Sequence, residues 1–262
     1  MDGNRALQAF HDQLRRCPMG APPGYRVERE PGIVRLVSET GGSSTLICAE
    51  LADLDVDAAI AAQIARFDGD PAGWEWKHYS YDEPDDLPER LLAAGFEAEP
   101  VEALLVAEIA ELDLSVALPD GVELVEVRGA AAVRAMVAFQ DEVFGSTRPG
   151  LADSLIARLS QRPARAVATM ALAGGEPIAA GRVELEPGTE FVGGWGGCTR
   201  GDWRGRGVFR ALVAHGAGLA AERGFRYVQV DANDQSRPIL LRLGFVELCK
   251  TTPYVARGGH AE

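Results

Sequence analysis

The part of this sequence that most restricts its fold is a glycine-rich strand that runs through an arginine and glycine loop into a long helix. It reads Gly196-Gly-Cys-Thr-Arg-Gly-Asp-Trp-Arg-Gly-Arg-Gly-Val-Phe-Arg-Ala-Leu-Val213. Glycines let a backbone approach a ligand closely, and the free amides at the start of a helix attract an anion. The stretch therefore indicates an α/β protein whose loop, at residues 200–207, holds a phosphate-bearing ligand.

Two familiar phosphate-binding loops fit this stretch poorly. A P-loop needs a lysine and a hydroxyl residue after its last glycine, and neither follows Gly205 or Gly207. A dinucleotide-binding loop needs the pattern G-x-G-x-x-G, and Arg210 stands at the third glycine. A close contact between helix and strand leaves no room for a large side chain there. The dinucleotide interpretation is therefore a minor alternative.

The remaining pattern is R-x-x-G-x-[GA], present here as Arg204-Gly-Arg-Gly207-Val-Phe209. It resembles the acyl-CoA pyrophosphate loop of the GNAT superfamily of N-acetyltransferases. A second motif of that family is a strand, an asparagine and a short helix that ends in Leu-Gly-Phe. Residues 227–231, Asn233 and residues 236–245 match it in order and spacing.

This resemblance implies an α/β (α+β) fold of the GNAT type, with a mixed, mostly antiparallel sheet flanked by helices. A smaller, degenerate GNAT-like half is expected before it, because Leu91-Leu-Ala-Ala-Gly-Phe96 echoes Leu240-Leu-Arg-Leu-Gly-Phe245 within a shared order of elements. We therefore expect a degenerate region at residues 1–115 and a catalytic GNAT domain at 116–262. The first half lacks Arg-x-x-Gly before its helix and is not expected to bind CoA.

Apolar periodicity and turn residues predict the individual elements. Helices are expected at residues 6–16, 53–67, 86–94, 130–144, 151–159, 208–223 and 237–243. Strands are expected at residues 33–38, 44–50, 74–81, 101–109, 122–127, 166–173, 178–185, 191–199, 227–231 and 247–255. The aromatic strand 74–81 is interpreted as core packing rather than as a substrate pocket.

The resemblance also implies that acetyl-CoA is the acyl donor and that backbone groups bind it. The residues expected to bind the cofactor are Gly197, Cys198 and Thr199 along the pantetheine arm, Arg204, Gly205, Arg206, Gly207 and Val208 at the pyrophosphate, and Asn233 at the second motif. Phe209 replaces the last small residue of the loop and fits if its ring points away. A covalent acyl intermediate on Cys198 is a minor alternative, because no base accompanies that thiol.

Three residues are the first candidates for catalytic proton transfer, namely Glu190, Asp231 and Tyr254. Glu190 and Asp231 lie next to the glycine-rich strand and its successor, and either could act as general base; Glu184 is a further candidate. In the family a tyrosine often protonates the departing thiolate, but Leu240 stands in its place here. Tyr254 on the last strand, or a water molecule, could substitute.

The net charge of the chain and its distribution exclude some classes of binding partner. The net charge is -13, and residues 1–115 hold 23 acidic and 9 basic side chains, whereas residues 116–262 hold 16 and 17. All excess negative charge thus lies in the first half. Because nucleic-acid binding depends on neutralising phosphates with Lys and Arg, no nucleic-acid partner is expected. We expect the acidic half to border the acceptor side and to favour cationic amines.

Location and metal content are also predicted. The N-terminus has no apolar run like that of a signal peptide, and no apolar stretch is long enough to cross a membrane. A cytoplasmic protein without a membrane partner, monomeric or homodimeric, is expected. The cysteines form no disulfide or metal-binding pattern, so no metal is expected; they are Cys17, Cys48, Cys198 and Cys249.

Together these features predict an acyltransferase of the GNAT N-acetyltransferase type. It would move an acetyl or other short acyl group from acyl-CoA to a primary amine, of a small molecule or a peptide, by direct attack in a ternary complex. The alternative is a non-catalytic module that binds acyl-CoA for regulation or interaction.

Overall fold

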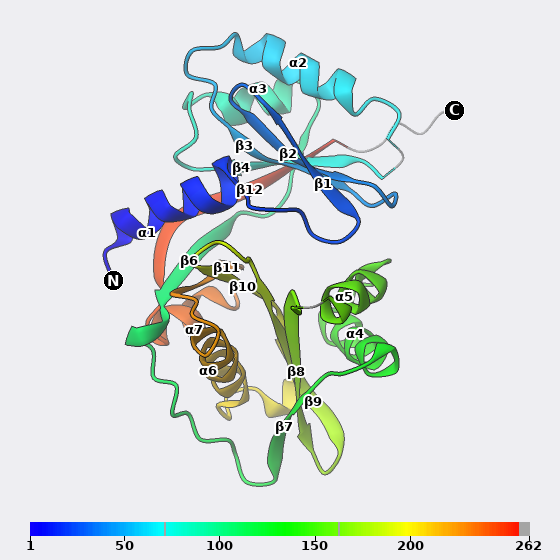
Figure 1. Ribbon diagram of the computed structural model, residues 1–262, viewed down its shortest axis with the longest axis vertical. Coiled ribbons are helices and arrows are strands. Elements are labelled where there is room, and N and C mark those ends of the chain that lie inside the picture. Colours follow the sequence, from blue (N-terminus) through cyan, green and yellow to red (C-terminus); the bar gives the residue numbers. More distant parts are fainter. Residues whose placement is uncertain (71, 162, 257–262) are drawn as a thin grey trace. The chain divides into compact units, whose positions relative to one another are not determined.

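The computed structural model describes residues 1–70, 72–161 and 163–256 (Figure 1). The chain forms two compact units. The C-terminal unit comprises Met1, Leu105–Val230 and Pro238–Val246, and the N-terminal unit comprises Asp2–Leu104, Asp231–Arg237 and residues 247–256. Each unit thus takes residues from both halves of the chain, and the division into residues 1–115 and 116–262 stays a sequence prediction.

The C-terminal unit is built on five strands in the order β11-β10-β9-β8-β7. Only β10 and β11 are parallel; the other pairs are antiparallel. The strands are β7 (Val122–Glu126), β8 (Ala166–Ala173), β9 (Glu176–Leu185), β10 (Phe191–Thr199) and β11 (Tyr227–Ala232). The helices are α4 (Ala130–Phe144), α5 (Leu151–Ser160), α6 (Val208–Ala221) and α7 (Arg237–Arg242). The strand β11 and the helix α7 each cross the boundary between the two units.

Helices cover both faces of this sheet (Figure 1). On one face, α4 and α5 pack with β8, β9 and β10 in a core that includes Met136, Leu155 and Ala180. On the other face, α6 contributes Val208 and Leu212 to a second core cluster. The predicted mixed, mostly antiparallel sheet flanked by helices is confirmed.

The strands of the N-terminal unit pair in the order β1-β2-β3-β4-β12, with β5 paired to β12. Its strands are β1 (Tyr25–Glu30), β2 (Ile33–Ser38), β3 (Ser44–Ala49), β4 (Trp74–Tyr79), β5 (Glu97–Ala98) and β12 (Val246–Ala256); β6 (Glu102–Glu108) crosses the unit boundary. Its helices are α1 (Gly3–Phe10), continued by a π-helical segment (His11–Arg16), α2 (Val56–Arg66) and α3 (Leu87–Ala93).

The aromatic strand β4 supplies the core of this unit. Trp74 and Trp76 are buried in one apolar cluster with Phe67, Phe96 and Tyr254. Trp74 stacks on Phe67, with ring centroids 4.7 Å apart, and meets Phe96 edge to face at 5.0 Å. These two tryptophans therefore pack in the core, as predicted.

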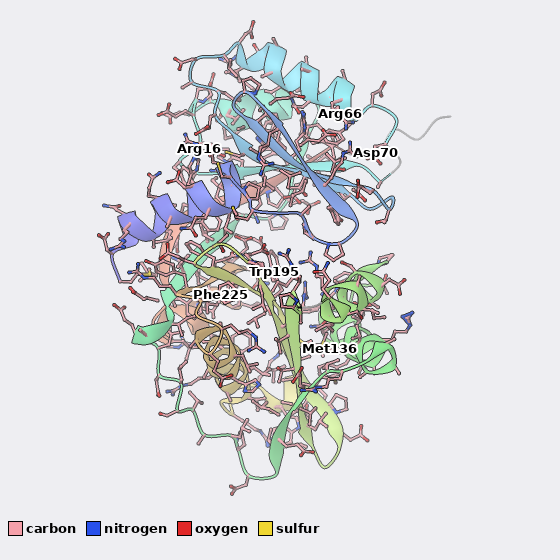
Figure 2. All side chains as sticks on the ribbon, viewed as in Figure 1. Arg16, Arg66, Asp70, Met136, Trp195 and Phe225 are labelled. Atoms are coloured by element: carbon pink, nitrogen blue, oxygen red, sulfur yellow. The ribbon has the colours of Figure 1, made fainter. Side chains whose placement is uncertain are left out.

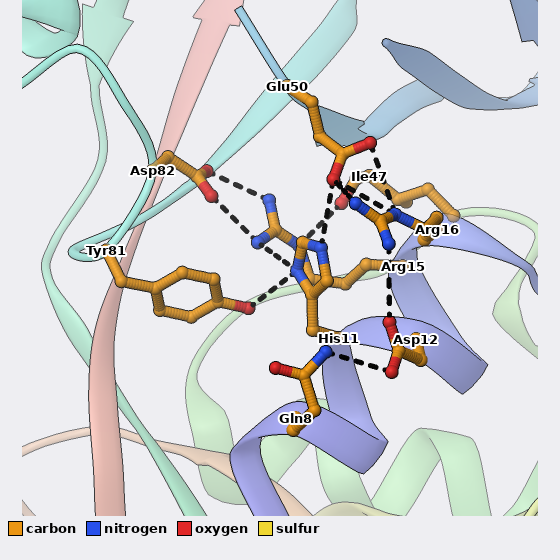
Figure 3. Close-up of polar contacts among 9 residues, drawn as sticks. All are labelled: Gln8, His11, Asp12, Arg15, Arg16, Ile47, Glu50, Tyr81 and Asp82. Carbon is orange, nitrogen blue, oxygen red and sulfur yellow. Dashed lines mark hydrogen bonds and ion pairs between the residues drawn. The ribbon is translucent and has the colours of Figure 1, made fainter. Parts of the chain in front are cut away.

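A buried ion pair fixes the π-helical segment to the N-terminal unit (Figure 3). The Arg15 guanidinium is 1 % exposed and donates two hydrogen bonds to the carboxylate of Asp82, at 2.7 and 2.9 Å. It also donates to the carbonyl oxygen of Ile47 and lies 3.8 Å from the ring centre of Tyr79. Because Arg15 is buried with a carboxylate, a carbonyl and an aromatic face as partners, this cluster is structural.

The sequence echo corresponds to one local structure that occurs in both units. After α3, the amide of Phe96 donates to the carbonyl of Leu91 at 3.1 Å, and after α7 the amide of Phe245 donates to Leu240 at 3.1 Å. The glycine before each phenylalanine has a positive φ, as a left-handed helix end requires. The strands before the two motifs, β3 with β4 and β10 with β11, each pair in parallel over three residue pairs.

Candidate functional site

The main feature of the C-terminal unit is a gap between β10 and β11. The two strands pair only from Phe191 opposite Tyr227 to Gly193 opposite Gln229, although β10 continues to Thr199. On its other side, β10 breaks register with β9 between Trp195 and Cys198, as a bulge does. The backbone of β10 beyond Gly193 can therefore pair with an extended ligand, as an added strand would.

The glycines of β10 are required by their surroundings. A Cβ on Gly194 would lie 3.0 Å from Val230, and one on Gly197 would lie 2.8 Å from the ring of Phe209. Phe209, which replaces a small residue of the expected loop, therefore packs its ring on β10 rather than projecting between the loop amides. Glycine in β10 lets this large side chain occupy the first turn of α6.

The loop after β10 ends at the start of α6 with its backbone amides unsatisfied by side chains. Gly205 and Gly207 both adopt positive φ, at 75° and 84°, which favours glycine. No side chain caps α6, so the amides of Val208, Phe209 and Arg210 keep no intrahelical or side-chain partner, and the first helical hydrogen bond is from Ala211 to Gly207. Such a helix start is an anion-binding site.

The arginines of the loop stabilise its shape. Arg204 donates from Nε to the carbonyl oxygen of Thr199 at 3.1 Å, which closes the loop back onto β10. The guanidinium of Arg206 stacks 4.8 Å from the ring centre of Trp203. Both side chains bring positive charge to the start of α6, where a pyrophosphate would gain from it.

The corresponding helix of the N-terminal unit lacks this site. The carboxylate of Asp55 accepts a hydrogen bond from the amide of Ala58 and so caps α2, and Asp57 adds a second acid to the first turn. An anionic ligand would meet two carboxylates there.

A small pocket lies beside α6 and α7 in the C-terminal unit, with a volume of about 140 Å³. It offers two cationic groups, from Arg210 and Arg242, and Arg210 pairs with Asp113 at 2.7 Å. The remaining lining residues are Leu112, Val213, Ala214 and Leu243.

Cys198 is a buried core residue. Its side chain is 5 % exposed and packs under α4 and α5. Burial raises the pKa of its thiol to about 11, so the thiol is almost entirely protonated at neutral pH. A protonated thiol is a weak nucleophile. The geometry therefore disfavours the covalent alternative.

We expect iodoacetamide to alkylate Cys17 of the folded protein and to leave Cys198 unmodified, because Cys17 is exposed and Cys198 is buried. Mass spectrometry of the digested protein measures both sites in one sample. Cys198 should react after unfolding in denaturant. Rapid alkylation of Cys198 in the native protein would contradict a buried, protonated thiol.

Asn233 has a defined role at the second motif. Its side-chain oxygen accepts hydrogen bonds from the amides of Gln235 and Ser236, at 3.1 and 3.0 Å. Its backbone carbonyl accepts the amide of Arg237, the first residue of α7. Asn233 therefore forms the turn that starts α7, which positions this helix.

The structure does not bring the three catalytic candidates together. Glu190 precedes β10 and forms an ion pair with Arg226 at 3.4 Å. It lies five residues before Trp195, roughly 16 Å along an extended strand. The side chain of Glu184 is 9 % exposed, and Arg158 and Arg182 each contact one of its two oxygens, so neither oxygen is left without a partner.

Asp231 and Tyr254 face opposite sides of the N-terminal sheet. Lys77 forms an ion pair with Asp231, whereas its neighbour Trp76 pairs in register with Tyr254 inside the apolar core. Side chains alternate between the faces of a strand, so Lys77 and Trp76 point to opposite sides. Burial also raises the pKa of Tyr254.

Asp231 keeps one oxygen without a partner. Its side chain is 6 % exposed, Lys77 contacts Oδ2, and Oδ1 is buried without a hydrogen bond within the described residues. The Coulomb attraction of Asp231 helps to hold the pKa of Lys77 above its ordinary value although burial opposes it. Burial and the charge of Asp231 raise the pKa of Glu102, and burial chiefly raises that of Glu75.

Four polar or aromatic residues that line β10 were not predicted as site residues. They are Gln140 on α4, Arg182 on β9, Trp195 on β10 and Gln229 on β11. Trp195 (Figure 2) is 37 % exposed, and Gly197, two residues further along β10, is exposed as well. Gln140 could have been noticed in the sequence, because it is a polar residue on the helix face that Val133, Met136 and Val137 define as buried.

The described part of the chain contains no group of three or more His, Cys, Asp or Glu residues able to hold a metal ion. Within the same residues, no helix combines the length and apolar character needed to span a bilayer.

The C-terminal unit thus combines a glycine-lined gap between two parallel strands with an uncapped helix start. Residues 134–245 match the sequence model of the acetyltransferase (GNAT) family. This part of the chain is a GNAT acetyltransferase domain. No match was found among curated protein sequences.

Solved structures share the fold over nearly the whole chain. A GCN5-related N-acetyltransferase from Kribbella flavida is 19 % identical, with a TM-score of 0.73 over 99 % of this chain and 97 % of that one. A GCN5-related N-acetyltransferase from Sphaerobacter thermophilus is 14 % identical (TM-score 0.61, covering 98 % and 86 %). A tandem GNAT protein from the clavulanic acid biosynthesis pathway is 13 % identical (TM-score 0.60, covering 93 % and 86 %). At these identities the likeness is one of fold.

Proposed function

We propose that this protein transfers an acetyl or other short acyl group from acyl-CoA to a primary amine, by direct attack in a ternary complex. The gap between β10 and β11, which leads to the uncapped start of α6, is the observation that carries the proposal. The family match at residues 134–245 gives it a chemical class.

Acyl-CoA binding is assigned mainly to backbone groups. The pantetheine arm would pair with β10 at Gly197, Cys198 and Thr199, and the pyrophosphate would lie at residues 204–208. The amide of Arg204 donates to the carbonyl of Gly201, so Arg204 would contribute through its charge. The pocket with Arg210 and Arg242 suits the charged nucleotide end. Asn233 would act through the placement of α7.

The chemistry needs one new bond and one broken bond. The nitrogen of a neutral amine attacks the thioester carbonyl carbon, and a backbone amide of β10 stabilises the oxyanion that forms. The carbon–sulfur bond then breaks, CoA leaves as a thiolate, and the nitrogen loses a proton. A thiolate is a tolerable leaving group because thiol pKa values lie near 8.5. We propose that water protonates it, since Leu240 is buried and has no proton to give.

We propose Asp231 as the residue that accepts the amine proton. Of the three candidates it alone combines a position on β11 with a buried oxygen that has no partner. Lys77 holds Oδ2 of this carboxylate in an ion pair, which leaves Oδ1 as the oxygen that can accept the proton.

The experiment measures acetyl-CoA binding by calorimetry and thiol release with a panel of primary amines. Asp231→Asn is expected to lower kcat about 100-fold, the range of a lost general base, with little change in acetyl-CoA affinity. Tyr254→Phe is the matched control and should stay close to wild type. The double variant Lys77→Met/Asp231→Asn, which leaves no buried ammonium unpaired, separates catalysis from folding.

The same experiment addresses the non-catalytic alternative, which the buried Leu240 favours. Acetyl-CoA binding without thiol release above the protein-free rate, with any amine, would support that alternative. Absence of acetyl-CoA binding would contradict both functions.

A further inference from the structure

The side chains around the bulge of β10 converge on one glycine. A Cβ on Gly196, whose φ is 63°, would lie 2.6 Å from Nε2 of Gln140 and 2.8 Å from Nη1 of Arg182. Arg182 is also directly opposite Trp195 in the register of β9 and β10. A guanidinium and a carboxamide therefore reach the backbone of β10 at its bulge, on the face covered by α4 and α5.

The positive charge of Arg182 is not balanced locally. Glu184 is the carboxylate partner of both Arg158 and Arg182, and the three side chains are 9 %, 14 % and 9 % exposed, respectively. Two guanidinium groups thus share one carboxylate. The nearby Arg148 has its own partner, Asp141, at 3.0 Å.

Arg182 also has unused donors. Its Nε donates to Glu184 at 2.7 Å, and within the described residues neither Nη atom donates a hydrogen bond. Burial lowers the pKa of Arg182 despite the attraction of Glu184. Because an arginine stays protonated in proteins, the group is a buried cation short of compensation. Such a cation is stabilised when an anion reaches it.

Two buried amide oxygens complete the arrangement. Gln140 is 0 % exposed, and its Nε2 donates to the carbonyl of Gly196 at 2.7 Å, which fixes the direction of the amide. Its Oε1 has no partner within the described residues, and neither has Oε1 of Gln229, a residue that is 8 % exposed. A Cβ on Gly193 would lie 2.9 Å from Nε2 of Gln229. These oxygens can accept hydrogen bonds from an amine.

We propose that the acceptor is an amine that also carries a carboxylate, with the carboxylate bound by Arg182 and the amine N–H groups directed to the side-chain oxygens of Gln140 and Gln229. This inference rests on the proposed function and names its substrate class. Arg158 and Arg182 together exceed their shared ion-pair partner Glu184 by one charge, and burial raises the pKa of the neighbouring Glu186. A carboxylate monoanion balances one positive charge, whereas a phosphate dianion exceeds it. Trp195, partly exposed beside Arg182, offers an apolar wall to the rest of the substrate.

The first test compares matched amines at saturating acetyl-CoA: phenylalanine, phenylalanine amide and phenethylamine, with O-phosphoethanolamine as the phosphate arm. We expect kcat/KM for the amino acid to exceed that for its amide about 100-fold, the effect of one buried charge pair. Equal rates, or a preference for the amide or the phosphate, would overturn the inference. The net charge of the first half predicts the opposite order, with cationic amines preferred.

The second test uses variants of the two arginines. Arg182→Gln should reduce the preference for the carboxylate below about 10-fold, chiefly through KM for the amino acid, while turnover of the amide persists. Arg158→Gln removes the other guanidinium from Glu184 and should retain the preference. If Arg182→Gln and Arg158→Gln lost the preference for the carboxylate equally, the preference would depend on net positive charge. That result would contradict a specific contact with Arg182.

A binding measurement separates this inference from the proposed function. N-acetylphenylalanine should bind the CoA complex of the wild type more tightly than its amide, and Arg182→Gln should abolish that difference. Transfer to amines without such discrimination defeats the inference alone. If acetyl-CoA binds and no amine is acylated, the proposed function fails.

Discussion

Replacing Gly207 with aspartate is expected to weaken acyl-CoA binding about 100-fold while the protein remains folded. Gly207 immediately precedes α6, whose first amides have no side-chain partner. A carboxylate there would repel the pyrophosphate and compete for the amides that hold it. Loss of two hydrogen bonds to a charged group, about 3 kcal/mol together, corresponds to roughly a 100-fold loss of affinity. Calorimetry with acetyl-CoA measures this directly.

Two matched variants show whether charge at the helix start is the cause. Gly207→Asn imposes the same backbone strain without the charge and should bind at least ten times more tightly than the aspartate variant. Gly224→Asp places an aspartate at another positive-φ glycine, just after the other end of α6, where no atom lies within 4 Å of a new Cβ. It should bind like the wild type. Equal weakening by all three would indicate a general loss of structure.

The binding stoichiometry offers a related check. The N-terminal unit already has Asp55 and Asp57 at the start of α2. We therefore expect no second acetyl-CoA site at the start of α2. The heat of acetyl-CoA binding to the Gly207→Asp variant should disappear rather than fall by half.

Glu184→Gln is expected to lower the free energy of unfolding by about 3 kcal/mol, the cost of leaving buried charge without its partner. Glu184 is the carboxylate partner of both Arg158 and Arg182, all three being largely buried. Removing its charge leaves two guanidinium groups facing each other. Urea denaturation at neutral pH, followed by circular dichroism, measures the loss.

Arg182→Gln is the matched control, because Glu184 keeps Arg158 as a partner. This change should cost little, and the double variant Arg182→Gln/Glu184→Gln should recover part of the loss caused by Glu184→Gln. A double-mutant cycle isolates that interaction. If Arg182→Gln destabilised the protein more than Glu184→Gln, the positive charge would be balanced by other groups, and the anion site proposed at Arg182 would lose its basis.

Local sequence signals predicted most of the elements. The strand at residues 191–199 was predicted with its observed bounds, and the helix from Val208 was expected to end at residue 223 and ends at Ala221. The strand β1 was not predicted, because Tyr25-Arg-Val-Glu-Arg-Glu30 is mostly charged and has no buried residue. A strand held by backbone pairing with β2 leaves little apolar pattern to detect.

The candidate site was only partly predictable. The loop around Gly207 is a contiguous motif whose glycines and helix start act through the backbone, so the sequence displays it directly. Gln140, Arg182 and Gln229 come from three separate elements and meet only through packing. Closeness in sequence was also a poor guide to catalytic residues. Glu190 immediately precedes the glycine-rich strand β10, yet its side chain forms an ion pair with Arg226.

The sequence by itself determined that this chain has a GNAT acetyltransferase domain. The loop at residues 204–209 and the short helix that ends in Leu243-Gly-Phe245 are each formed by consecutive residues, so the sequence displays both motifs directly. The tertiary structure alone decided which side chains share a face. The register between β4 and β12 places Tyr254 with the core and Lys77, with Asp231, on the opposite side. The register between β9 and β10 places Arg182 beside Trp195. A shift of one residue in strand register would move these side chains to the opposite face of the sheet. Register depends on contacts between segments that are distant in sequence, so only the tertiary structure decides it.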